Sequence, residues 1–221
     1  MNWGNFDKYL SKDMKELGEC VQNYENNRIV YREEIDGEIF YIKKYIMKKR
    51  DSFLSNLGIK NDLAKHYQKV SRKLKEINIL HIAPEYIAVK NENMLQRTAI
   101  LVMKDGGTPL NDYINDYEEK LEFFKEFFNI FIKLCKNKIY SRDYNLEGAL
   151  LGKDEKLRLI DFDKYRIKKI ITKKFKEKLI NNLKKSYLKK NRKKSFEDFL
   201  KKEIDRVVKE LGWEKDIEWR E

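Results

Sequence analysis

The chain has 221 residues, of which 41% are hydrophobic and 13% aromatic, with only 9 glycines and 2 prolines. This composition excludes a disordered chain and one divided by a Gly- or Pro-rich linker, so we expect one folded domain over 1–221. The net charge is +12, but fifteen Lys/Arg and one acid between Lys164 and Lys194 give that segment +14 and leave −2 elsewhere. This asymmetry indicates an anionic partner: a phosphorylated lipid, a membrane face or nucleic acid.

The cysteines and histidines bear on two further classes. Cys20 and Cys135 lie far apart without a CxxC, and His66 and His81 form no ligand-spaced cluster. A disulfide framework is therefore excluded by count, and we do not expect a structural zinc site. The charged first 17 residues do not form a signal peptide, and no run reaches the roughly 18 apolar residues of a spanning helix. We expect a soluble, cytoplasmic protein.

The first part of the chain predicts a short helix and then a sheet. Residues 5–17 have the texture of a helix, and residues 19–46 alternate between β-branched or aromatic and polar side chains. Asp36-Gly37 separates two such runs and is a strong hairpin signal. We expect three antiparallel strands here.

A helix and two more strands follow. Residues 60–77 carry apolar side chains at helical spacing: Leu63, Tyr67, Val70, Leu74 and Ile77. The runs PEYIAVK and RTAILVM, joined by a turn at residues 91–93, predict a second pair of strands.

The second half is mostly helical. Asp105 to Pro109 breaks the pattern, and a short helix at 110–114 and a long one at 118–135 follow. The buried stripe of the long helix comprises Leu121, Phe124, Phe127, Phe128, Phe131, Ile132 and Cys135. Residues 149–162 predict a hairpin, and from about Lys168 the chain is basic and helical, with Trp213 and Trp219 near its end. Strands followed by helices favour an α+β domain with two lobes.

Three short motifs contain the residues for chemistry. FYIKKY places Lys43 in a strand that closes a hairpin, YSRDYN places Asp143 after a long helix, and LRLIDFDK places Asp161 at a strand end, 18 residues after Asp143. Phosphoryl transfer needs a lysine for the α/β-phosphates, a carboxylate for Mg²⁺ and a second carboxylate for the attacking hydroxyl. Lys43, Asp161 and Asp143 match these roles in that order. Alternation leaves Lys43 and Lys44 on opposite faces of their strand.

These motifs stand in the order of a protein-kinase fold, and IDFDK followed by the basic NNLKKSYLKKNRKK resembles the Kdo/heptose lipopolysaccharide kinases, most of all Kdo kinase. The resemblance covers about residues 25–195. It implies a bilobal protein-kinase-like fold, with a small antiparallel-sheet N-lobe at about 18–104, a hinge at about 102–107 and a helical C-lobe at about 108–221.

The resemblance also implies site residues and partners. The backbone of Val102 to Lys104 would bind adenine, with Leu150 or Leu151 below the base, and Asn145 would join Asp161 at the metal. The cofactors would be ATP and Mg²⁺, and the acceptor a Kdo or heptose sugar of lipopolysaccharide core. The segment 164–194 would contact an anionic surface on the inner face of the inner membrane.

The sequence departs from the kinase pattern at four points. Gly148 stands where a kinase has an asparagine five residues after the catalytic aspartate, and Asn145, Glu147 or Asp163 could substitute for it. Ser141 stands where a histidine is usual. Residues 25–28 replace a glycine-rich loop, although backbone amides of a tight turn can also bind phosphate. The helix at 60–77 offers no well-placed glutamate for Lys43.

Other functions therefore stay open beside an active sugar kinase. One is a kinase-like binding protein without catalysis. A basic nucleic-acid-binding protein is less favoured, because the basic tail has few aromatics near its densest charge, where Tyr187 lies, and no groove-reading motif is present. A small-molecule antibiotic-type phosphotransferase would not need the +14 segment.

Overall fold

The computed structural model describes residues 2–11, 17–24, 27–59, 63–185 and 193–217. The chain divides into two compact units, and each is described by itself. The first unit is Met1–Arg72 with Ile82–Asp105, and the second is Lys73–His81 with Gly106–Glu221. In the described part of the chain, no helix is long and apolar enough to cross a membrane.

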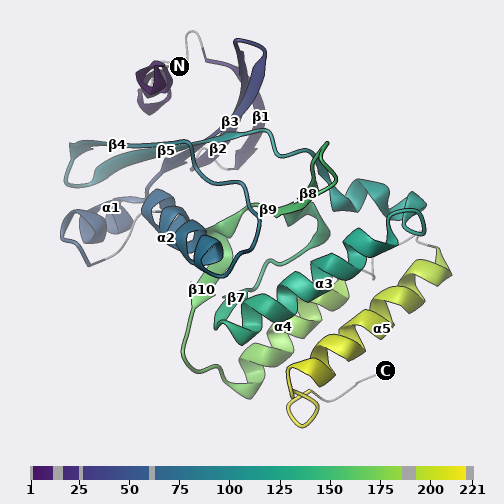
Figure 1. Ribbon diagram of the computed structural model, residues 1–221. Helices are drawn as coiled ribbons and strands as arrows, with labels where there is room; N and C mark the ends of the chain where they lie inside the picture. Colours follow the sequence, from purple (N-terminus) through teal and green to yellow (C-terminus); the bar gives the residue numbers. More distant parts are fainter. Residues whose placement is uncertain (1, 12–16, 25–26, 60–62, 186–192, 218–221) are drawn as a thin grey trace. The chain divides into compact units, whose positions relative to one another are not determined.

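The first unit is built on a five-stranded antiparallel sheet in the order β1-β2-β3-β5-β4 (Figure 1). Its strands are β1 (Glu19–Tyr24), β2 (Arg28–Ile35), β3 (Glu38–Ile46), β4 (Tyr86–Asn93) and β5 (Gln96–Lys104). All five predicted strands are confirmed. Asp36 and Gly37 have positive φ angles of 54° and 78°, as a two-residue hairpin turn between paired β2 and β3 requires.

The two faces of this sheet are covered by different elements (Figure 1). The 3₁₀ helix η1 (Trp3–Leu10) packs Phe6 and Tyr9 with Phe40 and Ile42, which alternate along β3 on one face. The helix predicted at 5–17 thus begins earlier and ends at Leu10, and residues 12–16 lie outside the described part. Tyr67 of α2 (Leu63–Glu76) lies against Lys43 on the opposite face.

Two corrections concern the helices of this unit. The buried stripe of α2 consists of Ala64, Tyr67, Val70 and Leu74, whereas the predicted member Leu63 is exposed at the first position of the helix. A short helix, α1 (Lys49–Asn56), was not predicted. Its sequence KRDSFLSN lacks an apolar stripe, and Ser52 is its buried residue.

Three helices form the main layer of the second unit (Figure 1). They are α3 (Leu121–Lys136), α4 (Lys173–Lys185) and α5 (Lys194–Glu210), with α5 in contact with both α3 and α4. The predicted stripe of α3 is buried except for Leu121, which is half-buried at its first turn. Phe124 packs edge-to-face on Phe196 of α5, at 5.3 Å between ring centroids, so aromatic contacts join the two helices.

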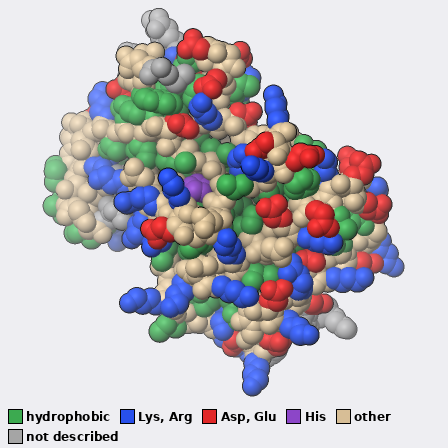
Figure 2. All heavy atoms as spheres, viewed as in Figure 1, with side chains coloured by type: hydrophobic (Ala, Val, Ile, Leu, Met, Phe, Trp, Pro, Cys, Tyr) green, Lys and Arg blue, Asp and Glu red, His purple; other side chains and the backbone are tan. Residues whose placement is uncertain are grey.

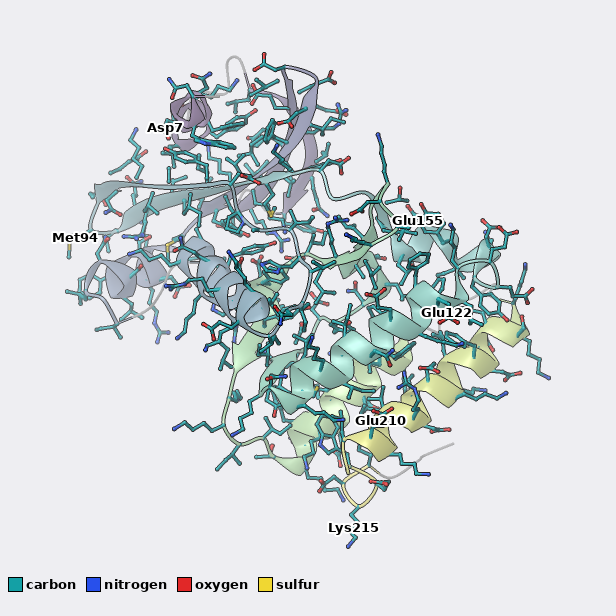
Figure 3. All side chains as sticks on the ribbon, viewed as in Figure 1. Asp7, Met94, Glu122, Glu155, Glu210 and Lys215 are labelled. Carbon is teal, nitrogen blue, oxygen red and sulfur yellow. The ribbon has the colours of Figure 1, made fainter. Side chains whose placement is uncertain are left out.

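Short elements link these helices. They are η2 (Leu110–Asp116), η3 (Leu146–Gly148), η4 (Phe162–Lys164), and the strands β6 (Thr108–Pro109), β7 (Ile139–Ser141), β8 (Ala149–Leu151), β9 (Leu157–Leu159) and β10 (Tyr165–Ile167). The predicted hairpin is confirmed as β8–β9, with Glu155, labelled in Figure 3, in its turn. Strand β9 ends at Leu159, earlier than predicted.

The basic tail is helical over less of its length than predicted. Strand β10 ends at Ile167, and α4 begins only at Lys173, where the Thr172 Oγ1 accepts the N–H of Phe175 (3.3 Å) and caps the helix. The run Ile170-Ile171-Thr172 is β-branched, which disfavours an earlier start. Residues 186–192, with Tyr187, lie outside the described part, as does Trp219.

Candidate functional site

Lys43 lies in β3 and is 7% exposed. Its strand neighbours in the register are Val30 on β2 and Leu101 on β5. The Lys43 Nζ lies 5.8 Å from the centroid of the Tyr67 ring on α2. A ring face attracts an ammonium ion through its quadrupole. Tyr67 therefore faces Lys43 from the helix in which the sequence offered no glutamate.

Lys44 is also buried, but on the other face of β3. Its Nζ donates to the carbonyl of Ser11 (2.7 Å), next to the end of η1. Burial lowers the pKa of this amine, and Glu92 opposes the shift. The two lysines thus have different environments, as the alternation of the strand predicts.

The end of β5 contains the predicted adenine-binding residues. Val102 pairs with Ile42 on β3, and its carbonyl accepts the N–H of Glu85 (2.9 Å). The Val102 side chain is fully buried in the core. The exposed Lys104 donates to Glu38 (2.9 Å), and this hydrogen bond raises the pKa of Lys104.

Gly107 lies against β8 in the second unit. Its φ is 109°, and a Cβ at this position would lie 2.2 Å from the backbone oxygen of Leu151. Only glycine fits this approach. The glycine break therefore holds the chain next to Leu151, and β6 then pairs with β8 through Thr108 and Leu151.

The loop after β7 holds Asp143 in place through its neighbours. The N–H of Asp143 donates to the Oγ of buried Ser141 (3.1 Å). The Tyr144 hydroxyl donates to the carbonyl of Phe127 (2.7 Å) on α3, and the two rings stack at 4.4 Å. The Asp143 side chain is exposed. The Ser141 and Tyr144 contacts thus fix the backbone of the loop, while the exposed Asp143 carboxylate is accessible to a substrate hydroxyl group.

Asn145 and Gly148 lie next to the strand that leads to Asp161. The Asn145 Oδ1 accepts the N–H of Gly148 (2.9 Å) and caps η3. The Gly148 carbonyl accepts the N–H of Ile160 (2.9 Å), the residue before Asp161. A Cβ at Gly148 would lie 3.6 Å from Asn145 Oδ1 and 3.7 Å from the Ile160 oxygen, which are ordinary contact distances. Position 148 therefore has room for a side chain.

Asp161 has a left-handed backbone, with φ 62° and ψ 65°. This conformation is uncommon for a residue other than glycine, and such residues cluster at functional sites. Four residues later, Tyr165 of β10 pairs with Ser141 of β7, two residues before Asp143. The pairing of β7 with β10 thus brings the two aspartate-bearing segments together.

The buried Tyr165 reports on both carboxylates. Burial raises the pKa of its hydroxyl, and the negative charges of Asp161 and then Asp143 raise it further. Both charges must lie near one phenol to do so. Phe162, the residue after Asp161, is fully buried and packs edge-to-face on Tyr165 and on His81, with 5.2 and 5.7 Å between ring centroids.

The oxygen ligands of this region suit a magnesium ion. The described residues contain no group of three His, Cys, Asp or Glu side chains that could hold a metal. Mg²⁺ in nucleotide sites uses one or two carboxylates together with substrate phosphates, so Asp161 and Asn145 fit this requirement. Of the other proposed ligands, Glu147 is exposed and Asp163 is 6% exposed.

The predicted site residues fall into two sets. Lys43, Val102 and Lys104 belong to the first unit, and the second unit brings together Asp143, Asn145 and Asp161, with Leu151 on its hairpin. The meeting of the two sets around one nucleotide stays a prediction. The phosphate-binding role of residues 25–28 also stays one, since residues 25 and 26 lie outside the described part.

Sequence reasoning missed Tyr67 as the neighbour of Lys43 and Tyr165 as the neighbour of the aspartates. Tyr67 was placed correctly on the buried stripe of its helix, but an aromatic residue in such a stripe predicts only packing in the core. Tyr165 lies in a three-residue strand that is too short to show a period. The position of Tyr165 directly after IDFDK was the available signal.

A five-stranded antiparallel sheet with η1 on one face and α2 on the other is followed in the chain by a helical unit that contains Asp143 and Asp161, and this is the order of elements in a protein-kinase-like fold. No protein-family model matches the chain, and no curated protein matches its sequence.

Solved structures match it over most of its length. WaaP, solved in complex with acyl carrier protein, has a TM-score of 0.63 and 15% identity over 97% of this chain and 93% of WaaP. The ROP18 kinase domain, solved with AMP-PNP and sucrose, has a TM-score of 0.51 and 12% identity over 83% of this chain and 74% of that domain. The predicted fold class is confirmed.

Proposed function

We propose that this protein transfers the γ-phosphate of ATP to a hydroxyl group of a lipopolysaccharide-core sugar, either Kdo or heptose. One observation supports this most: Asp143 and Asp161 flank the β7–β10 pairing and both act on the buried Tyr165, within a protein-kinase-like fold. Two acids in these positions match the base and the metal ligand of phosphoryl transfer.

Each residue has a role that its surroundings support. The exposed Asp143 would accept a hydrogen bond from the sugar hydroxyl and take its proton late in the transfer, while Ser141 holds its backbone. Asp161 and Asn145 would hold Mg²⁺, which supplies neutralisation of phosphate charge when bound.

The nucleotide would be bound by the other predicted residues. Lys43 would neutralise the α/β-phosphates with its amine, which lies beside the Tyr67 ring in a residue that is 7% exposed. The backbone at the end of β5, from Val102 to Lys104, would bind adenine, with Leu151 below the base. The ROP18 domain was solved with AMP-PNP, which supports nucleotide use in this fold.

The proposed acceptor class is supported by a likeness in sequence and by a likeness in structure. The IDFDK motif and the basic tail resemble the Kdo/heptose kinases, and the structure matches WaaP, a lipopolysaccharide-core kinase. Such a substrate is anchored in lipid. We therefore place the enzyme in the cytoplasm, at the inner face of the inner membrane.

The test is phosphate transfer from radiolabelled ATP to core oligosaccharides that end in Kdo or heptose, with Mg²⁺. We expect Asp143→Asn, which removes the proposed general base, and Asp161→Asn, which removes a proposed metal ligand, each to lower kcat at least about 10²-fold. Asp198→Asn, an exposed acid on α5 of the same unit, is the control for loss of one charge. Unchanged turnover in both site variants, with folding verified by circular dichroism, would contradict the proposal.

The second candidate is a kinase-like binding protein without catalysis, because Gly148 removes a usual metal ligand. It predicts a thermal shift with ATP that does not depend on Mg²⁺. Sustained transfer to any sugar excludes it.

A further inference from the structure

The loop between β10 and α4 combines exposed apolar and cationic side chains. Ile170 is 86% exposed and Ile167 is 41% exposed. From Ile167 to Lys174 the sequence contains four lysines and no acid, and all four lysines are exposed: Lys168, Lys169, Lys173 and Lys174. An isoleucine with this exposure gains nothing from the core of its own unit.

The local structure holds this loop in a defined position. On one side, the N–H of Lys168 donates to the carbonyl of Lys138 (3.0 Å), and on the other Thr172 caps α4. The Lys168 Nζ lies 4.6 Å from the centroid of the Phe175 ring. The loop is thus anchored at both ends, with Ile170 between the anchors.

We propose that this loop, residues 167–174, is a membrane contact in which Ile170 inserts among anionic lipid headgroups and the flanking lysines bind their phosphates. An apolar side chain surrounded by cations suits an interface whose interior is apolar and whose surface is negative. The biological role of this contact rests on the proposed function, because a lipid-anchored sugar substrate would be presented at such a surface.

An acidic protein is the other kind of partner that positive charge could attract. A stable protein interface needs a broad patch with an apolar centre, of the order of 800 Å² on each partner. Here the most exposed apolar residue is one isoleucine between lysine pairs. The narrow apolar tip therefore favours a lipid surface.

The local charge pattern also distinguishes this loop from the rest of the surface. On the face drawn in Figure 2, Lys and Arg side chains are spread among acidic and apolar ones. Further along α4, Lys176 is paired with Asp216 (2.5 Å). In the loop itself no acid interrupts the lysines, so all of its charged side chains are positive.

The experiment is sedimentation of the full chain with phosphatidylcholine vesicles that contain one third phosphatidylglycerol, and with pure phosphatidylcholine vesicles. We expect binding to the anionic vesicles only, weakened by salt. Lys168→Gln/Lys169→Gln should weaken it about 25-fold, at roughly fivefold per lysine. Ile170→Ser should weaken it about tenfold, from lost apolar transfer.

Matched controls separate this loop from general charge. Lys201→Gln/Lys202→Gln removes an adjacent exposed pair from α5, the helix that ends at Glu210 (Figure 3), and should leave binding within about twofold. Ile59→Ser, at a residue 70% exposed in the first unit, should do the same. Equal losses in loop and control variants, or no preference for anionic vesicles, would overturn the proposal. So would binding to an acidic protein, but not to vesicles, through Lys168 and Ile170.

Vesicle binding is measured without ATP or sugar. A chain that binds vesicles through Ile170 but transfers no phosphate refutes the proposed function and supports the membrane contact. A chain that phosphorylates soluble core sugar but does not bind anionic vesicles supports the proposed function and refutes the membrane contact.

Discussion

The two regions that hold the predicted site residues position them by different means. In the second unit, Asp143 and Asp161 are set by backbone hydrogen bonds and by the pairing of β7 with β10. In the first unit, Lys43 is set by strand alternation and burial against the Tyr67 ring. The β7–β10 pairing brings the segments of the two acids together, and the Lys43 amine lies beside the Tyr67 ring of α2. Carboxylate geometry is therefore specified locally, and the lysine depends on packing.

The largest effect should come from exchanging the two lysines of β3 for methionine. Lys43→Met should lower kcat/KM for ATP roughly 10²-fold or more, the scale for removing a preorganised electrostatic contact. Lys44→Met should leave kcat/KM within a few-fold, because its amine donates to Ser11 on the opposite face. Steady-state kinetics at saturating sugar measures both. Equal losses in the two variants would mean that Lys43 has no special place at the nucleotide.

The next effect tests the ring beside Lys43. Tyr67→Leu removes the aromatic face and should raise the KM for ATP about 3- to 30-fold, since cation–π contacts contribute about 0.5–2 kcal/mol. Tyr67→Phe keeps the face and loses only the hydroxyl, which donates to the Ile82 carbonyl at 3.4 Å. Its KM should stay near that of the native chain. If the Phe variant were as impaired as the Leu variant, the hydroxyl rather than the ring would position the lysine.

The contrast between the regions also explains what the sequence could predict. The five strands of the first unit follow from alternation and from Asp36-Gly37, and the α3 stripe follows from a 3.6-residue period. Helix α1 could not be predicted from the sequence, because it is short and has no apolar stripe. Strands β7 and β10 could not be predicted either, because three residues are too few to show a period. Asp143 and Asp161 could be named from their motifs. That the segments of Asp143 and Asp161 lie close together follows from the pairing of β7 with β10, and no local sequence pattern predicts this pairing.

A smaller effect should come from a change at the proposed metal site of the second unit. Gly148→Asn restores the usual kinase ligand at a position where a Cβ meets only ordinary contacts, and the φ of Gly148 is not positive. We expect the variant to fold and to need several-fold less Mg²⁺ for half-maximal turnover, because one more oxygen ligand is supplied. Titration of activity with Mg²⁺ measures this. Gly148→Ala is the control, and an equal gain in it would point to stiffening of the backbone instead.

The smallest effect concerns His81, which packs on Phe162 beside Asp161. Burial lowers the pKa of His81, and the hydrogen bond to the Ile79 carbonyl only partly opposes this. The unfolded chain, with an ordinary pKa near 6.5, then binds a proton more readily than the folded chain. The stabilisation from neutral His81 is therefore complete above about pH 6.5 and is lost as the pH falls through the lower folded pKa. Thermal unfolding between pH 7 and 5.5 should show a loss of at most about 1.4 kcal/mol per pH unit, reduced in His81→Phe and retained in His66→Gln. A slope that disappeared only in the His66 variant would assign the acid sensitivity to the first unit instead.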